Sequence, residues 1–317
     1  MDNLDPKNVL GSTEMMLDQC IYIWELAKNL KFPQNYKSAK DITLCGMGGS
    51  RYGGYIINSL YQSELKVPFF DYGDYHLPGF VNDKSLFFLS SYSGDTEEPL
   101  NSAQEAIERG VPIVGLTSGG KVMEMSKKFN FPALVFDQKY NPSTQPRLGT
   151  GYMVIGTIAL LTGLGCLQVS DSDINTAIEE VRNNQENIKA RAKETAKKFQ
   201  GYIPIIFGAQ HLVGNAHIMR NQFNETSKSF AAFEDIPELN HHLMEGLKNP
   251  ADKKLMALFL ASDLYEDKYK KRVVLTQDVV SKNNIQAAEY NAAGSTKLSQ
   301  MLNVLSFGGY LTLYLAF

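Results

Sequence analysis

Two short segments carry residues that could bind an anion without a basic side chain. The first is Cys45-Gly46-Met47-Gly48-Gly49-Ser50, which lies between an apolar run and a helical pattern at Tyr52 to Leu60. Glycines let the backbone turn tightly, and the N–H groups that open a helix point at an anion. The loop lacks the lysine of a Walker loop, and Arg51 stands where a dinucleotide-binding fingerprint has its last glycine. Alone, it could equally be a strand-to-helix turn without a ligand.

The second segment is Ser90-Ser91-Tyr92-Ser93-Gly94-Asp95-Thr96-Glu97-Glu98. Its hydroxyls and backbone amides, with the dipole of the helix that follows, could neutralise a phosphate. The alternative is simple capping, in which Ser93 or Asp95 satisfies the first amides of that helix. Two such loops at the carboxyl ends of neighbouring strands would meet where doubly wound sheets bind ligands. We therefore predict a phosphate site made of Gly48, Gly49, Ser50, Ser91, Ser93 and Thr96.

Short apolar runs alternate with helical patterns through the first half of the chain. This alternation predicts an α/β fold, with a doubly wound, mostly parallel sheet flanked by helices. A preceding helix is predicted from Ser12 to Leu30 with Ser12 as its N-cap, and the uncharged stretch from Gly151 to Val169 is interpreted as a buried core helix rather than a membrane span. The expected strands are Ile42 to Cys45, Val67 to Phe70, Leu86 to Leu89, Ile113 to Leu116 and Ala133 to Phe136.

The second half of the chain repeats the first in a degenerate form. The predicted strand Tyr202 to Phe207 ends at Gly208, and 208 − 46 places this glycine 162 residues after Gly46. At the same offset, Phe70-Asp71-Tyr72-Gly73-Asp74 falls beside the similar Ala232-Phe233-Glu234-Asp235. The segment between the halves is strongly charged. We predict two domains, residues 1–170 and 201–317, joined by a helical connector at residues 171–200.

The two loops together resemble the phosphosugar-binding pair of the sugar isomerase (SIS) domain. Three later segments, Pro146-Arg147, Asn221 to Lys228 and Pro237-Glu238-Leu239-Asn240-His241, resemble the bifunctional phosphoglucose/phosphomannose isomerase family. The resemblance implies two SIS domains. It also implies an isomerase that interconverts glucose 6-phosphate and/or mannose 6-phosphate with fructose 6-phosphate by ring opening and enediol proton transfer.

The resemblance assigns catalytic roles to Glu225, His241 and Arg147. Glu225 would be the base that moves a proton between C1 and C2, although it could instead be an exposed carboxylate paired with Lys228. His241 would open the sugar ring, and in the resembled family this histidine reaches into the other subunit's site, which implies a homodimer. Arg147 would stabilise the enediolate, the alternative being a surface arginine that caps the sheet edge.

One departure from the family pattern concerns a lysine. The resembled family continues past the apolar helix that here ends at Tyr314-Leu315-Ala316-Phe317, and its tail brings a catalytic lysine. We therefore expect either a truncated chain or an upstream lysine, such as Lys297, in that role.

Composition limits the partners of the chain. The net charge of −3 and pI of about 6.0 give no general attraction for nucleic acid or an anionic membrane, which favours a small-molecule sugar phosphate. Cys20, Cys45 and Cys166 indicate reduced thiols, and Met1 to Val9 lacks the apolar core of a signal peptide, so a cytoplasmic protein is expected. The histidine spacing indicates no metal site, and no cofactor is expected.

Two other functions remain open from sequence alone. The chain could be a non-catalytic phosphosugar sensor, although no basic recognition helix stands out. It could also be an isomerase of another sugar phosphate, such as a pentose or heptose phosphate.

Overall fold

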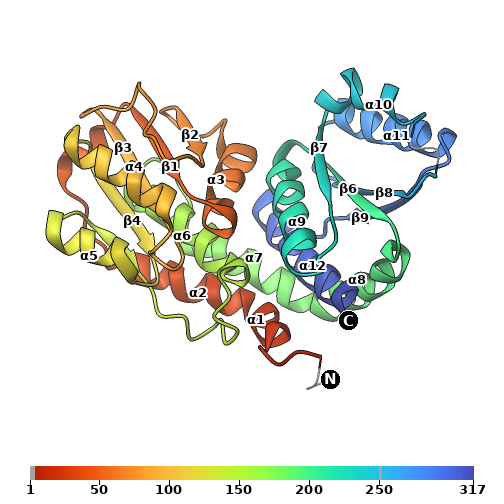
Figure 1. The fold of residues 1–317 in the computed structure, drawn as a ribbon, viewed down its shortest axis with the longest axis horizontal. Coiled ribbons are helices and arrows are strands. Elements are labelled where there is room, and N and C mark those ends of the chain that lie inside the picture. Colours follow the sequence, from red (N-terminus) through yellow and green to blue (C-terminus); the bar gives the residue numbers. More distant parts are fainter. Residues whose placement is uncertain (1–3, 250–251) are drawn as a thin grey trace. The chain divides into compact units, whose positions relative to one another are not determined.

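The computed structural model describes residues 4–249 and 252–317, so the first three residues of the amino-terminal stretch considered above lie outside the described residues. The chain divides into two compact units. We call Asp5–Asp171 the amino-terminal unit and Ser172–Phe317 the carboxyl-terminal unit. Each is an α/β structure with a parallel sheet between helices, which confirms the predicted fold class (Figure 1).

The amino-terminal unit is built on a five-stranded parallel sheet in the order β2-β1-β3-β4-β5. The central strand β3 is buried at every position, as expected of a parallel strand covered on both faces. All five predicted strands are present. Their bounds are β1 Asp41–Cys45, β2 Phe69–Tyr72, β3 Ser85–Ser90, β4 Ile113–Thr117 and β5 Ala133–Val135.

Helices cover both faces of this sheet. Figure 1 shows α4 and α5 over one face, whereas α3 and α6 cover the other and α2 packs on α6. The predicted core helix is α6, which is buried from Thr150 to Leu161. Among the described residues, no helix is long and apolar enough to cross a membrane. The helices are α1 Val9–Glu14, α2 Met16–Ala27, α3 Tyr52–Ile56, α4 Glu97–Glu108, α5 Gly120–Phe129 and α6 Thr150–Gly163.

The carboxyl-terminal unit has a four-stranded parallel sheet in the order β7-β6-β8-β9. Helices α9 and α12 pack together on one face with α8 against α12, and α11 packs on the strands from the other face. The strands are β6 Ile203–Ala209, β7 Ala232–Ile236, β8 Leu255–Ala261 and β9 Gln286–Asn291. The helices are α7 Asp171–Asn183, α8 Gln185–Phe199, α9 Val213–Glu225, α10 Leu243–Gly246, α11 Asp267–Lys282 and α12 Lys297–Ala316.

Strand register confirms the degenerate repeat. Thr43 of β1 pairs with Phe70 of β2, and Ile205 of β6 pairs with Ala232 of β7. Both members of the second pair lie 162 residues after their counterparts in the first, since 205 − 43 and 232 − 70 give the same number. The two sheets therefore begin with the same supersecondary unit. The separate connector at residues 171–200 stays a prediction.

The predicted helix from Ser12 to Leu30 is wrong at its start and in its continuity. The first helix begins at Val9, because the side chain of Asn8 accepts a hydrogen bond from the Gly11 amide and so acts as the N-cap. Ser12 lies buried inside this helix, and the helical pattern is interrupted at Met15. Strand β2 also begins two residues later than predicted, after Pro68, which has no amide proton to donate to a sheet.

Candidate active site

The first predicted phosphate loop follows β1 and leads into a 3-10 turn, η2 (Gly48–Arg51), before α3. Ser50 is buried there, and its Oγ accepts a hydrogen bond of 2.8 Å from the backbone amide of Tyr92 in the second loop. Ser90 Oγ donates in turn to the Ser50 carbonyl oxygen at 2.6 Å. The two loops therefore lie against each other, as predicted for the ends of the neighbouring strands β1 and β3.

The second loop gathers its hydroxyls at the start of α4. Ser91 Oγ accepts a hydrogen bond of 3.1 Å from the Gly94 amide and lies 2.9 Å from Thr96 Oγ1. Since only one proton can occupy the hydrogen bond between Ser91 and Thr96, one of these two hydroxyls keeps a proton to donate elsewhere. Ser93 is exposed at the surface of the same loop.

Capping does not explain the polar residues of this loop. The N-cap of α4 is Thr96, and its side chain makes no capping hydrogen bond. Asp95 instead accepts a hydrogen bond of 3.1 Å from the Lys121 amide in the first turn of α5. Ser93 accepts one from the amide of Asp95 at 3.3 Å. Neither Ser93 nor Asp95, the two candidate caps, therefore accepts a hydrogen bond from the first amides of α4.

Arg147 lies beside the first loop, in a 3-10 turn, η4 (Pro146–Leu148), that packs on η2. A Cβ placed on Gly49 would lie 3.2 Å from the Pro146 carbonyl oxygen and 3.4 Å from the Arg147 Cα. One guanidinium nitrogen of Arg147 donates to Gln145 Oε1 at 2.7 Å, whereas its buried Nε has no hydrogen-bond partner among the described residues. The structure therefore brings together both loops and the predicted arginine within the amino-terminal unit.

Glu225 and His241 belong to the carboxyl-terminal unit. Glu225 is the last residue of α9 and is half-buried, whereas His241 is exposed at the end of a 3-10 turn, η6 (Glu238–His241), that follows β7. Asn240 anchors this turn, because its Nδ2 donates to Thr276 Oγ1 on α11 at 2.8 Å. The two predicted catalytic residues thus lie on elements next to one strand, since α9 also packs on β7.

The chain is similar over most of its length to curated proteins, of which two are described. The bifunctional phosphoglucose/phosphomannose isomerase of Caldicellulosiruptor bescii is 29% identical over 92% of this chain and 88% of that protein. The protein of the same name from Aquifex aeolicus is 31% identical over 87% of this chain and 84% of that protein. The chain belongs to the bifunctional phosphoglucose/phosphomannose isomerase family. It is accordingly an enzyme of the isomerase class.

Two further comparisons agree with this family. The family described as the bacterial phospho-glucose isomerase C-terminal SIS domain matches residues 188–317. Among solved structures, the tagatose-6-phosphate ketose/aldose isomerase of Escherichia coli superposes with a TM-score of 0.72 at 15% identity, covering 99% of this chain and 92% of that one. At this low identity the structural match supports the fold alone.

The family motifs did not reveal how the first loop is braced. Arg51, which follows Ser50 directly, forms an ion pair with the carboxylate of Asp71 in β2 and donates to its carbonyl oxygen at 2.9 Å. Asn58 also donates to the Asp71 carboxylate. The first loop is therefore tied to the sheet by a half-buried charge pair. The sequence held one indication of this ion pair, because Arg51 stands where a dinucleotide-binding fingerprint has its last glycine.

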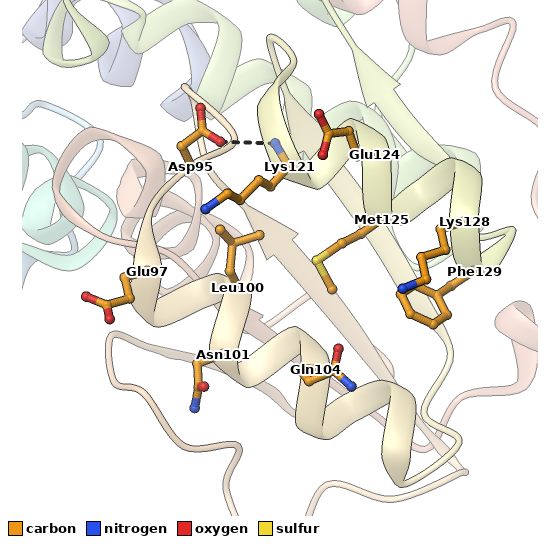
Figure 2. A pocket seen from close by; sticks show the side chains of 10 residues that line it. All are labelled: Asp95, Glu97, Leu100, Asn101, Gln104, Lys121, Glu124, Met125, Lys128 and Phe129. Carbon is orange, nitrogen blue, oxygen red and sulfur yellow. Dashed lines mark hydrogen bonds between the residues drawn. The ribbon is translucent and has the colours of Figure 1, made fainter.

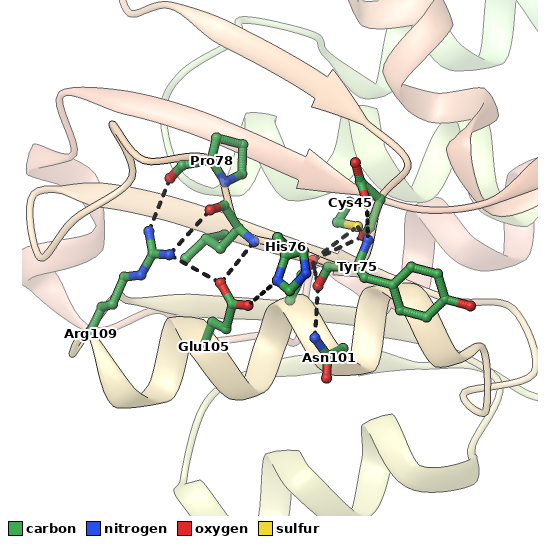
Figure 3. A network of polar contacts seen from close by, with 10 residues as sticks. Cys45, Tyr75, His76, Pro78, Asn101, Glu105 and Arg109 are labelled. Atoms are coloured by element: carbon green, nitrogen blue, oxygen red, sulfur yellow. Dashed lines mark hydrogen bonds and ion pairs between the residues drawn. The ribbon is translucent and has the colours of Figure 1, made fainter.

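A second network holds the segment after β2 against α4 (Figure 3). The carboxylate of Glu105 accepts hydrogen bonds from the Leu77 amide at 3.0 Å and from Arg109 at 3.0 Å, and it pairs with His76 Nδ1 at 2.8 Å. The contact with Glu105 raises the pKa of His76, and the contact with His76 lowers the pKa of Glu105. Cys45 belongs to the same network and is buried, which raises the pKa of its thiol. These contacts tie the segment after β2 to α4.

A groove of about 690 Å³ lies between α4 and α5 (Figure 2). Its floor is apolar, from Leu100, Met125 and Phe129, and its rim is charged. Asp95 and Glu97 of the second segment line this groove, but none of the six predicted phosphate ligands does, so we do not assign it to the phosphate. Within residues 4–249 and 252–317, no group of three His, Cys, Asp or Glu residues could hold a metal ion.

Proposed function

We propose that this enzyme interconverts glucose 6-phosphate and/or mannose 6-phosphate with fructose 6-phosphate, by ring opening followed by enediol proton transfer. The names of the relatives support this substrate class. The observation that carries the proposal is the convergence of two hydroxyl-bearing loops and Arg147 at the carboxyl ends of β1 and β3. This is the place where a doubly wound sheet receives its ligand.

The phosphate group is proposed to bind the two loops. Ser50 Oγ already accepts a hydrogen bond from the Tyr92 amide, and Ser91 Oγ from the Gly94 amide, so both oxygens are oriented. The proton of Ser50 and one proton of the Ser91–Thr96 pair can then be donated. A hydrogen bond to a charged group contributes about 1.5–3 kcal/mol, so a few such donors can hold a phosphate without a lysine. The proposed phosphate ligands are Gly48, Gly49, Ser50, Ser91, Ser93 and Thr96.

The proton transfers are proposed for residues of the carboxyl-terminal unit. Glu225 would take the proton from C2 of the open-chain aldose and return it to C1. The proton of the C2 hydroxyl passes to the C1 oxygen, so the aldehyde becomes a ketone through an enediol. His241 would open the ring by protonating the ring oxygen as the anomeric hydroxyl loses its proton. Arg147 would stabilise the negative oxygen of the enediolate. These roles require neither a metal nor an organic cofactor, because side chains supply the base, the acid and the anion donors.

We also propose a cytoplasmic homodimer whose active site is shared between subunits. Mixing two inactive variants, Glu225→Gln and His241→Asn, tests the sharing directly. Half of the dimers formed at random are mixed, and each would contain one intact site, so activity should return to roughly a quarter of the wild-type value. A mixture that stays as inactive as its components, while forming dimers, would show that Glu225 and His241 act within one subunit.

The proposed reaction is tested by coupled turnover of fructose 6-phosphate to each aldose 6-phosphate. Formation of glucose 6-phosphate and mannose 6-phosphate would support the dual activity, and formation of one would identify a single-substrate isomerase. Failure to form either product, with fructose 6-phosphate still bound, would overturn the proposal in favour of a phosphosugar-binding protein or another substrate.

A further inference from the structure

Tyr92 stands between two predicted phosphate ligands but turns its side chain away from them. Its backbone belongs to the loops, because its amide donates to Ser50 Oγ at 2.8 Å and its carbonyl oxygen accepts from Ser118 Oγ at 2.7 Å. Its side chain is only 1% exposed. A loop residue that buries a tyrosine ring must place the hydroxyl against a partner, because an unpaired buried hydroxyl is costly.

The partners of this hydroxyl belong to the segment that leads to Arg147. Asn141 Nδ2 donates to the Tyr92 hydroxyl at 2.7 Å and also to the Gln145 carbonyl oxygen at 2.9 Å. The Gln145 side chain then accepts from the Arg147 guanidinium at 2.7 Å. Hydrogen bonds on either side of Gln145, one to its backbone and one to its side chain, therefore connect the second phosphate loop to the predicted enediolate-stabilising arginine.

The ring of Tyr92 makes a second connection to the same segment. Gly149 packs so closely on it that a Cβ there would lie 2.0 Å from Tyr92 Cε2. The backbone around Arg147 is thus held on the ring by contact and on the hydroxyl by hydrogen bonds. On its other sides the ring packs edge-on against Phe136 at 5.4 Å and Tyr152 at 6.3 Å between ring centroids. Tyr92 has little freedom to move.

The hydroxyl acts as a neutral group. Burial raises the pKa of Tyr92 to about 12, against which the hydrogen bond from Asn141 is a smaller effect. The phenol therefore stays protonated near neutral pH. Its hydrogen bonds can therefore fix the positions of neighbouring groups.

We propose that Tyr92 is a positioning residue that sets Arg147 in place relative to the phosphate-binding loops. It acts through Asn141 and Gln145 and touches no reacting atom. This inference rests on the proposed role of Arg147. Loss of the hydroxyl should therefore affect the two functions of the site differently. It should disturb the stabilisation of the enediolate, but it should leave phosphate binding intact, because Tyr92 contacts the loops through its backbone.

A double-mutant cycle with two binding probes tests this difference. The variants are Tyr92→Phe, Arg147→Gln and the double variant. The control is Tyr310→Phe, which removes a buried hydroxyl that accepts a hydrogen bond from Gln185 within the carboxyl-terminal unit. The probes are inorganic phosphate and arabinonate 5-phosphate, whose carboxylate mimics the enediolate oxygens. Calorimetric affinities for both probes are compared with kcat and KM for fructose 6-phosphate.

Tyr92→Phe should weaken arabinonate 5-phosphate binding and lower kcat on the order of tenfold, with phosphate affinity changed by less than about twofold. In the Arg147→Gln background it should have no further effect, because the residue through which it acts is gone. The Tyr310→Phe control should change neither affinity.

Three results would overturn the inference. Additive effects of Tyr92→Phe and Arg147→Gln would mean that Tyr92 does not act through Arg147, and equal weakening of both probes would indicate a general disturbance of the loops. An unchanged affinity for arabinonate 5-phosphate in Tyr92→Phe would mean that the hydroxyl positions nothing. A wild-type chain that binds both probes but turns over no sugar phosphate would overturn the proposed function alone, and one that binds neither would overturn both.

Discussion

Replacement of Gly94 by alanine tests whether contact between two loops holds the phosphate-binding hydroxyls in place. Gly94 has a φ of 81°, and a Cβ there would lie 1.9 Å from the Gly119 carbonyl oxygen. Gly110, at the other end of α4, has a similar φ of 68° but open space around its Cβ position. Gly110→Ala is therefore a matched control that carries the backbone strain without the collision.

The structure sets the size of the effect. A left-handed alanine costs about 1–2 kcal/mol in either variant. At Gly94, the loops must also separate by at least 1.1 Å, the difference between 1.9 Å and the 3.0 Å below which real Cβ atoms essentially never approach. This movement strains the hydrogen bonds from the Gly94 amide to Ser91 Oγ and from the Val122 amide to the Gly94 carbonyl oxygen. With about 1 kcal/mol for each bond, Gly94→Ala should lose about 3–4 kcal/mol of unfolding free energy.

Urea denaturation and steady-state kinetics measure the two consequences. Gly110→Ala should lose only the strain energy and keep the wild-type KM for fructose 6-phosphate. Gly94→Ala should lose more stability and raise KM about tenfold, because Ser91 is displaced from the phosphate. Equal losses of stability in both variants, with an unchanged KM in Gly94→Ala, would refute the idea that contact with Gly119 fixes the phosphate loop.

Three further predictions concern the hydroxyl of Thr96, the pair of His76 and Glu105, and the buried cysteine thiols. Thr96→Val keeps the side-chain shape but removes one hydroxyl, so KM for fructose 6-phosphate should rise about tenfold, the effect of losing one hydrogen bond to a charged group; an unchanged KM would exclude Thr96 as a phosphate ligand. The stabilisation by His76 and Glu105 should be fully present between the ordinary pKa of Glu, 4.5, and that of His, 6.5, and should be lost as pH rises through the raised pKa of His76 or falls through the lowered pKa of Glu105. The Tm difference between wild type and His76→Gln should thus be largest near pH 5.5 and shrink by about pH 8; a pH-independent difference would contradict the pairing. Burial raises the pKa of all three cysteine thiols, so a thiol reagent at pH 8 should react slowly with the folded chain and quickly after denaturation; rapid labelling of the folded chain would contradict it.

Features that depend on local pattern could be predicted from the sequence. The strands of the first half and the 162-residue offset of Gly208 from Gly46 were visible because parallel strands are continuous apolar runs. The pairing of Thr43 with Phe70 and of Ile205 with Ala232 shows the physical basis of this offset. The glycine and serine loops were recognised because their chemistry lies within a few consecutive residues.

Features that depend on distant partners could not be predicted. Asn141 lies 49 residues after Tyr92 in the sequence, and nothing in either neighbourhood indicates that the two side chains meet. Asn8, and not Ser12, is the N-cap of the first helix. Both residue types cap helices well, and only the structure shows which side chain accepts the backbone amide. The roles of Glu225 and His241 likewise stay predictions, since they rest on resemblance.

The central claim, enediol proton transfer by Glu225, is tested most directly by deuterium exchange. Fructose 6-phosphate is incubated with the enzyme in D₂O, and proton NMR follows the loss of the C1 proton signal. We predict that the wild type introduces deuterium at C1, and that Glu225→Gln binds the same sugar phosphate without exchanging it. Exchange by Glu225→Gln at the wild-type rate would contradict the assignment of this carboxylate as the base.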